Sequence, residues 1–290
     1  MSCVQPKQGK QTCFPFLHSK NIIQNIETII TVFNPETPIS EENRKRLFFD
    51  VINTLQSSSI PNKPNGIHMQ FDNEALTNLI VKSTMLSPED VADGKHLFND
   101  EEREMIQYKM EKALDLIKIL HPNLHYLMTQ LIGTLYFIKK EGNGGDSVSS
   151  LIGLIWLNPQ PDWTVIDYAE CMYHEFIHNS LFLDDMVNTI FPDTEVLGTE
   201  DALVTSSILK WKRPLDRSFH SAAVAIALSH FYTMLGDTKK AQSYLPSVEQ
   251  TVEELNSKTK YLGEQGVLTL NQMNHFLKAR DYESLSKFLF

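Results

Sequence analysis

Residues 164–183 read TVIDYAECMYHEFIHNSLFL, and this stretch decides what kind of fold the chain can form. A helix start is indicated just before this stretch by Pro161, Asp162 and Trp163. Apolar residues then recur at helical spacing. Because these residues lie on nearly every side of the helix, the stretch predicts a long helix with little exposed surface. They are Ile166, Tyr168, Ala169, Met172, Phe176, Ile177, Leu181 and Phe182.

The same stretch contains the motif H-E-x-x-H at residues 174–178. Residues four apart lie on one face of a helix, so His174 and His178 can reach one metal ion, with Glu175 beside it. The pattern also occurs by chance, usually on exposed helices or outside helices. A buried helix that carries two histidines and a glutamate needs a reason, and metal binding supplies one.

Two imidazoles do not complete a metal site, and the third ligand separates the possible functions. Asp184 is placed as in metzincin peptidases, but Leu181 stands where their motif needs glycine for a turn. Glu195 and Glu200 are at distances that suit a peptidase with a glutamate ligand, although they also fit as solvated loop acids.

His220 is a stronger candidate for the third ligand. Arg213, Arg217 and His220 are spaced i, i+4, i+7, so a helix that starts near Pro214 would place two guanidinium groups and an imidazole on one face. The alternative is that both arginines are surface charges and that His220 is a core histidine.

The rest of the chain is predominantly helical in pattern, and we expect a mainly α fold. The run LIGLIWL at residues 151–157 is β-branched-rich and bounded by turn residues, which predicts a small strand element next to the H-E-x-x-H helix. We expect an N-terminal helical region at 1–140, with 1–17 loosely ordered, and a metal-binding catalytic region with C-terminal helices at 141–290. The expected helices span about 21–33, 41–55, 100–120, 164–183, 214–235, 238–257 and 267–288.

Composition excludes several classes of protein. The 290 residues include 26 Lys and Arg against 36 Asp and Glu, a net charge of −10, which argues against a nucleic-acid partner. No apolar run is long enough for a membrane span, and the N-terminus does not resemble a signal peptide. The odd number of cysteines, Cys3, Cys13 and Cys171, favours a reducing compartment, so we expect a cytoplasmic protein.

The order of motifs resembles a known enzyme family. A strand, then H-E-x-x-H at 174–178, then R-P-L-x-x-x-x-H at 213–220 and an apolar helix are similar to the H-E-x-x-H-type 2-oxoglutarate-dependent peptide β-hydroxylases of ribosomal peptide (RiPP) modification. The resemblance covers about residues 146–236. It implies a non-haem Fe(II) held by His174, His178 and His220, with 2-oxoglutarate and O₂ as co-substrates. It also implies a peptide substrate, such as a precursor peptide with a leader.

Three functional hypotheses follow. In the leading one, a dioxygenase, Arg213 or Arg217 binds the distal carboxylate of 2-oxoglutarate, and Glu175 orients an imidazole, holds a water or faces the substrate. In the second, a zinc peptidase, Glu175 is the general base, and Asp184 or Glu200 is the third ligand. In the third, a non-enzymatic helical scaffold or peptide-binding protein, the histidines are structural.

Overall fold

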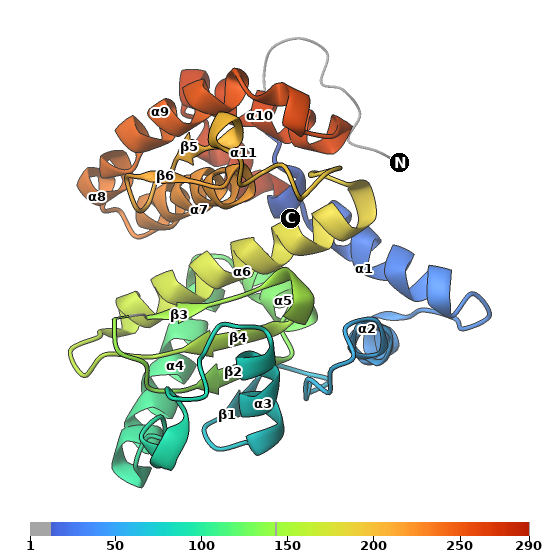
Figure 1. Ribbon diagram of the computed structural model, residues 1–290, viewed down its shortest axis with the longest axis vertical. Coiled ribbons are helices and arrows are strands. Elements are labelled where there is room, and N and C mark those ends of the chain that lie inside the picture. The colour runs from blue at the N-terminus through green and yellow to red at the C-terminus, as the bar shows by residue number, and fades with distance from the viewer. Residues whose placement is uncertain (1–12, 143, 290) are drawn as a thin grey trace. The chain divides into compact units, whose positions relative to one another are not determined.

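The computed structural model describes residues 13–142 and 144–289 (Figure 1). The fold is mainly α with a small mixed sheet, which confirms the expected class. The chain forms two compact units: unit 1 comprises Met1–Ile22 and Leu183–Phe290, and unit 2 comprises Ile23–Phe182. Residue 140, the expected boundary, therefore falls inside unit 2, because strands on either side of it pair with each other.

A four-stranded sheet organises unit 2, with strand order β1-β2-β4-β3. β1, β2 and β4 are parallel, and β3 is antiparallel to β4 at one edge. Every residue of β2 and β4 is buried, so neither strand alternates between polar and apolar residues. β4 lies within the predicted run 151–157, whereas β1 and β2 were not predicted. The strands are β1 His68–Gln70, β2 Thr134–Phe137, β3 Gly145–Asp146 and β4 Leu154–Leu157.

Side chains cap the starts of several helices of unit 2. Ser40 and Asn99 form capping boxes at the starts of α2 and α4, which begin where the expected helices 41–55 and 100–120 begin. α6 runs alongside β3 and β4 in Figure 1. The helices are α1 Ser19–Phe33, α2 Glu41–Leu55, α3 Glu74–Lys82, α4 Asp100–Leu120, α5 Pro122–Leu131 and α6 Val165–Asn188, with short 3-10 turns at Ala92–Gly94 and Ser149–Leu151.

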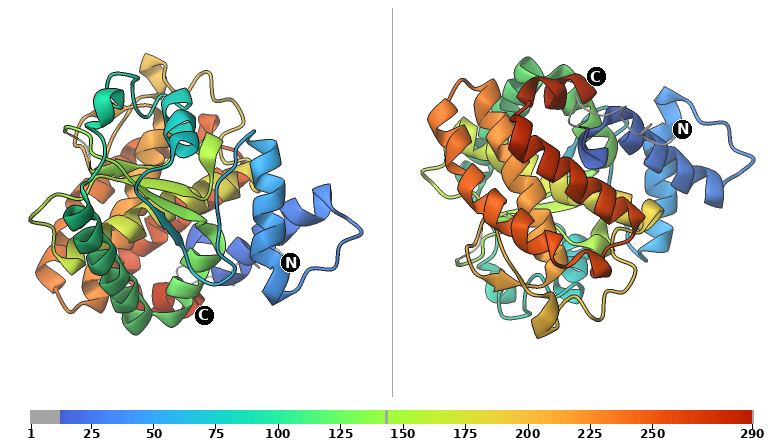
Figure 2. Two further views of the ribbon diagram at one scale, coloured as in Figure 1. Left: turned by 90° about the horizontal axis from the view of Figure 1, so that it is seen from below. Right: turned by 90° about the horizontal axis from the view of Figure 1, so that it is seen from above.

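Unit 1 is built around α7, which is buried over most of its length. α7 packs against α8, α9 and α11, and α9 packs against α10 (Figure 2, right). Each of the two predicted C-terminal helices is divided in two, by Pro246 at the start of α9 and by the left-handed Arg280 after α10. The elements are β5 Val204–Thr205, β6 Lys212–Arg213, α7 Leu215–Met234, α8 Thr238–Ser243, α9 Leu245–Asn256, α10 Glu264–Ala279 and α11 Tyr282–Phe288, with 3-10 turns at Pro15–Leu17, Glu200–Ala202 and Thr259–Tyr261.

The expectation of a loosely ordered segment at 1–17 is wrong for residues 13–17, and residues 1–12 lie outside the described part of the chain. Phe14, Phe16 and Leu17 are buried, and the Phe14 ring packs edge-on against Phe276. Burial of large apolar side chains outweighs the absence of a helical period here. Within the described ranges, no helix has the length and apolar character that a membrane crossing requires.

Candidate metal centre

The helix α6 forms as the sequence predicts. Thr164 precedes it, and its backbone N–H and Oγ–H both donate to the Asp167 carboxylate at 2.7 Å. The Asp167 N–H donates back to Thr164 Oγ at 3.4 Å, so the two residues cap the first turn reciprocally. Met172, Phe176 and Ile177 are fully buried, which fixes the rotation of the helix about its axis. His174, Glu175 and His178 are thereby held in defined directions within unit 2.

The two imidazoles of the motif approach each other closely. His174 Nε2 lies 3.2 Å from His178 Nε2, and both side chains are half-buried. With an imidazole–metal distance of roughly 2.1 Å, a 3.2 Å separation corresponds to an angle of about 100° at a shared ion, between the octahedral and tetrahedral values. The pair therefore fits one divalent first-row ion. Among the described residues, no group of three or more His, Cys, Asp or Glu side chains is arranged to hold a metal.

Burial controls the protonation of His174. Loss of hydration lowers its pKa to about 4, against a weaker opposing effect of the Glu170 charge. The imidazole is therefore neutral at pH 7. Because only a neutral imidazole binds a metal, His174 needs to release no proton when it coordinates one near neutral pH.

Glu175 is buried and has two different oxygen environments. Its Oε2 accepts a hydrogen bond from Ser147 Oγ at 2.7 Å, and its Oε1 lies 3.8 Å from His174 Nε2. Burial raises the pKa of Glu175 to about 8, the Asp146 charge acts in the same direction, and the Ser147 hydrogen bond opposes them. In the metal-free protein at pH 7 this carboxyl is therefore mostly protonated.

Two polar residues that the sequence analysis did not identify complete this side of the helix. Asn179 Nδ2 donates to Ser147 Oγ at 3.1 Å and to the Glu175 carbonyl oxygen at 2.9 Å. Asn179 Oδ1 accepts from the Gly153 N–H at 2.8 Å. The sequence could have indicated Asn179, because it is a polar residue four positions after Glu175 on a buried helix. No sequence pattern indicates Ser147, which lies in the connection between β3 and β4.

His220 lies in unit 1, on α7, and is buried. Its ring stacks on Phe191 with a centroid distance of 6.2 Å, and burial lowers its pKa to about 3. His220 is therefore a neutral imidazole at pH 7, which is the protonation state of a metal ligand.

The predicted alignment of Arg213, Arg217 and His220 on one helix face is wrong. The helix begins at Leu215, after Pro214, so Arg213 belongs to strand β6 instead. Arg217 does lie on α7 but is exposed, while His220 is buried and Arg213 is half-buried. Pro214 has no backbone N–H, so it cannot extend the β5–β6 hydrogen bonds beyond the Val204–Arg213 pair. The strand therefore ends at Arg213, and the helix begins after the proline.

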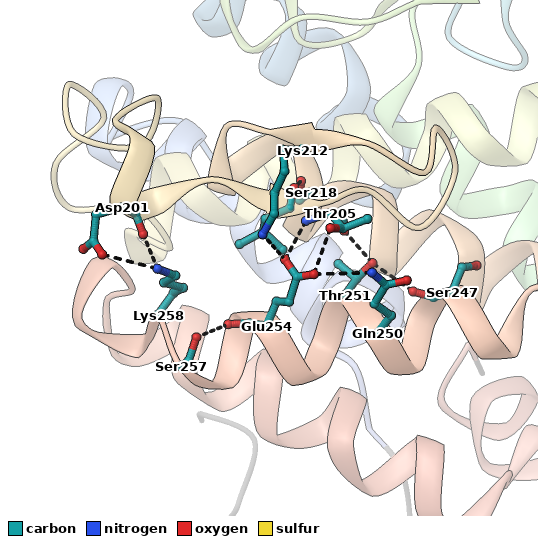
Figure 3. A network of polar contacts seen from close by, with 11 residues as sticks. Asp201, Thr205, Lys212, Ser218, Ser247, Gln250, Thr251, Glu254, Ser257 and Lys258 are labelled. Atoms are coloured by element: carbon teal, nitrogen blue, oxygen red, sulfur yellow. Dashed lines mark hydrogen bonds and ion pairs between the residues drawn. The ribbon is translucent and has the colours of Figure 1, made fainter.

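A polar network holds the β5–β6 hairpin, and with it Arg213, on α9 (Figure 3). The Glu254 carboxylate accepts from the Thr205 N–H and the Thr205 hydroxyl, each at 2.8 Å, and pairs with Lys212 Nζ at 2.8 Å. These hydrogen bonds lower the pKa of Glu254 against the opposing effect of its burial, which is the largest single influence. The hairpin that carries Arg213 is thus fixed at both of its strands.

The three acidic residues considered as alternative third ligands either accept hydrogen bonds from other side chains or are exposed. Asp184 is buried and accepts hydrogen bonds from Gln265 Nε2 at 2.9 and 3.1 Å and from Asn188 Nδ2 at 2.7 Å. Glu195 and Glu200 are exposed in the connection between α6 and β5, as solvated loop acids would be. All three belong to unit 1.

Comparison with known proteins finds no family model that matches this sequence and no curated protein with significant similarity to it. The resemblance to the H-E-x-x-H hydroxylases therefore depends on the motifs at residues 174–178 and 213–220.

Proposed function

We propose that this protein is an Fe(II)- and 2-oxoglutarate-dependent dioxygenase that hydroxylates a β-carbon of a ribosomally made peptide. The observation that carries the proposal is the 3.2 Å separation of His174 Nε2 and His178 Nε2, which matches two ligands of one first-row ion. When bound, Fe(II) with 2-oxoglutarate supplies O₂ activation and oxidation of a C–H bond. The protein's own residues supply binding, orientation and protection from water.

In this proposal His174, His178 and His220 are the metal ligands. Three neutral imidazoles suit a divalent first-row metal, and burial keeps His174 and His220 neutral at pH 7. Each ligand comes from a helix whose buried side restricts its rotation, so the imidazoles are directed before metal binds. His220 is the ligand that distinguishes this assignment from the peptidase.

Arg213 is the better of the two arginines for the distal carboxylate of 2-oxoglutarate. A guanidinium fork binds a carboxylate through two hydrogen bonds, and the interaction strengthens when water is excluded. Arg213 is half-buried on a hairpin fixed by Glu254, whereas Arg217 is exposed. A fixed and partly dehydrated arginine loses less conformational freedom on binding the anion.

The proposed substrate is a peptide such as a precursor with a leader segment, and the proposed compartment is the cytoplasm. The net charge of −10 disfavours nucleic acid as the substrate. The three irregularly spaced cysteines fit a reducing compartment.

A zinc peptidase is the second candidate, and one observation favours it. Glu175 Oε1 lies 3.8 Å from His174 Nε2, within reach of a water on a metal held by that imidazole. Against it, both oxygens of Asp184 already accept hydrogen bonds from Gln265, and Glu200 is exposed. The dioxygenase needs no carboxylate ligand and is therefore preferred.

The test is anaerobic reconstitution with Fe(II) and titration of 2-oxoglutarate, monitored through the visible charge-transfer band of the chelate. We expect the band to appear in the wild type and to be lost in His178→Ala, with His275→Ala on α10 as the matched control. We also expect Glu175→Gln to form succinate in the presence of O₂. Zinc-dependent peptide cleavage that is lost in Glu175→Gln, with no succinate from either protein, would instead establish the peptidase.

A further inference from the structure

We propose that Ser147 and Asn179 are positioning residues that fix the Glu175 carboxyl so that Oε1 faces the His174 imidazole. This inference rests on the proposed function, because it assigns a role to Glu175 at that metal centre. Ser147 Oγ lies 2.7 Å from Glu175 Oε2, and His174 Nε2 lies 3.8 Å from Glu175 Oε1.

Glu175 cannot set this orientation by itself. The terminal torsion of a glutamate is broad and nearly two-fold, so rotation exchanges the two oxygens at little cost. A hydrogen bond from one side removes that freedom. Ser147 provides the bond, and water does not compete for it, because Glu175 and Ser147 are 4% and 6% exposed and Asn179 is fully buried.

In the hydrogen-bond chain Gly153–Asn179–Ser147–Glu175, one backbone N–H determines which group donates and which accepts at each step. Gly153 N–H can only donate, so the Asn179 atom that it contacts must be the amide oxygen. Asn179 therefore presents its NH₂ group to Ser147 Oγ. With a donor already directed at its oxygen, the Ser147 hydroxyl points its hydrogen toward Glu175 Oε2.

The consequence is an asymmetric carboxyl. Oε2 is the hydrogen-bond acceptor at the end of the chain Gly153–Asn179–Ser147, so Oε1 is the oxygen that holds a proton or accepts one beside His174. Because Gly153 directly precedes β4 and Ser147 directly follows β3, the sheet sets the orientation of a side chain on α6.

Three variants test the chain. Ser147→Ala removes the donor to Glu175, and Ser147→Thr retains a hydroxyl. Asn179→Asp keeps an acceptor for Gly153 N–H but cannot donate to Ser147, so the serine hydroxyl should turn toward the new carboxylate. Thr77→Val is the matched control, because it deletes another buried hydroxyl of unit 2, one that contacts Tyr136.

The readouts are the affinity of the full-length protein for Co(II) and the visible d–d spectrum of the Co(II) form. We expect Ser147→Ala and Asn179→Asp to weaken Co(II) binding by about tenfold and to shift the spectrum, as changes around metal ligands do. Ser147→Thr and Thr77→Val should resemble the wild type. In a Glu175→Ala background, Ser147→Ala should have no further effect, because a positioning residue acts only through the group that it positions.

Wild-type affinity and spectrum in Ser147→Ala would overturn the inference, and so would an equal loss in the Glu175→Ala background. Its failure is distinguishable from failure of the proposed function. A wild type that binds Co(II) through the histidine pair but gives no 2-oxoglutarate chelate band overturns the dioxygenase and leaves the positioning role standing. A wild type that binds no Co(II) overturns both.

Discussion

Glu175→Gln should make the metal-free protein less sensitive to rising pH. The carboxyl is buried and its pKa is raised from 4.5 to about 8, chiefly by loss of hydration. Between these values the folded protein binds more protons than the unfolded chain, so its stability is fully present below pH 4.5 and declines as the pH rises toward 8. Glutamine occupies nearly the same volume and does not titrate, so the variant lacks this decline.

The size of the effect follows from the two pKa values of Glu175. Ionisation of this group in the unfolded chain lowers the free energy of unfolding by under about 1 kcal/mol at pH 5 and by about 3 kcal/mol at pH 7. The difference in unfolding free energy between Glu175→Gln and wild type should therefore change by about 2 to 3 kcal/mol over this interval, in favour of the variant at the higher pH.

Urea denaturation of chelator-treated protein at pH 5 and pH 7, followed by circular dichroism, measures this change. Glu104→Gln, at an exposed position on α4, is the matched control for replacing a glutamate by glutamine. Groups other than residue 175 titrate in both proteins and cancel in the comparison. An unchanged difference between Glu175→Gln and wild type at the two pH values would show that the folded protein ionises Glu175 as easily as the unfolded chain does. It would refute the assignment of a neutral, buried carboxyl.

Three further predictions concern the ligands, the arginines and the β4 connection. His178→Ala should weaken Co(II) binding at least about tenfold in titration calorimetry, because it removes one imidazole of the 3.2 Å pair, and His275→Ala should not. Arg213→Ala should raise the 2-oxoglutarate concentration needed for succinate formation by about two to three decades, as expected for loss of the charge partner of a carboxylate that is buried when bound; an equal effect of Arg217→Ala would contradict the assignment. Gly153→Ala should lower the free energy of unfolding by about 1 to 3 kcal/mol, because φ is +91° and a Cβ would lie 2.6 Å from a phenylalanine ring, and an unchanged Tm would contradict this.

The sequence alone was sufficient for the features that depend on local spacing. The apolar pattern at 164–183 predicted α6, and the expected helices at 41–55 and 100–120 coincide with α2 and α4. The i, i+4 spacing of His174 and His178 predicted that their imidazoles would meet on one face. These outcomes follow from helix geometry, which neighbours in the chain determine.

Tertiary structure decided what depends on residues far apart in the chain. The strand β2 shows no polar–apolar alternation, because it is a central parallel strand and all of its residues are buried. The edge strand β1 is only three residues long, and its pairing with β2 identifies it. Arg213 does not lie on the predicted helix face, because it belongs to β6, which pairs with β5. Helical spacing in the sequence cannot anticipate this pairing. Ser147 reaches Glu175 across 28 residues through the β3–β4 connection. The Ser147 hydroxyl can donate to Glu175 only when the sheet and α6 pack together. Because this packing excludes water, the buried carboxyl needs a hydrogen-bond donor from the protein.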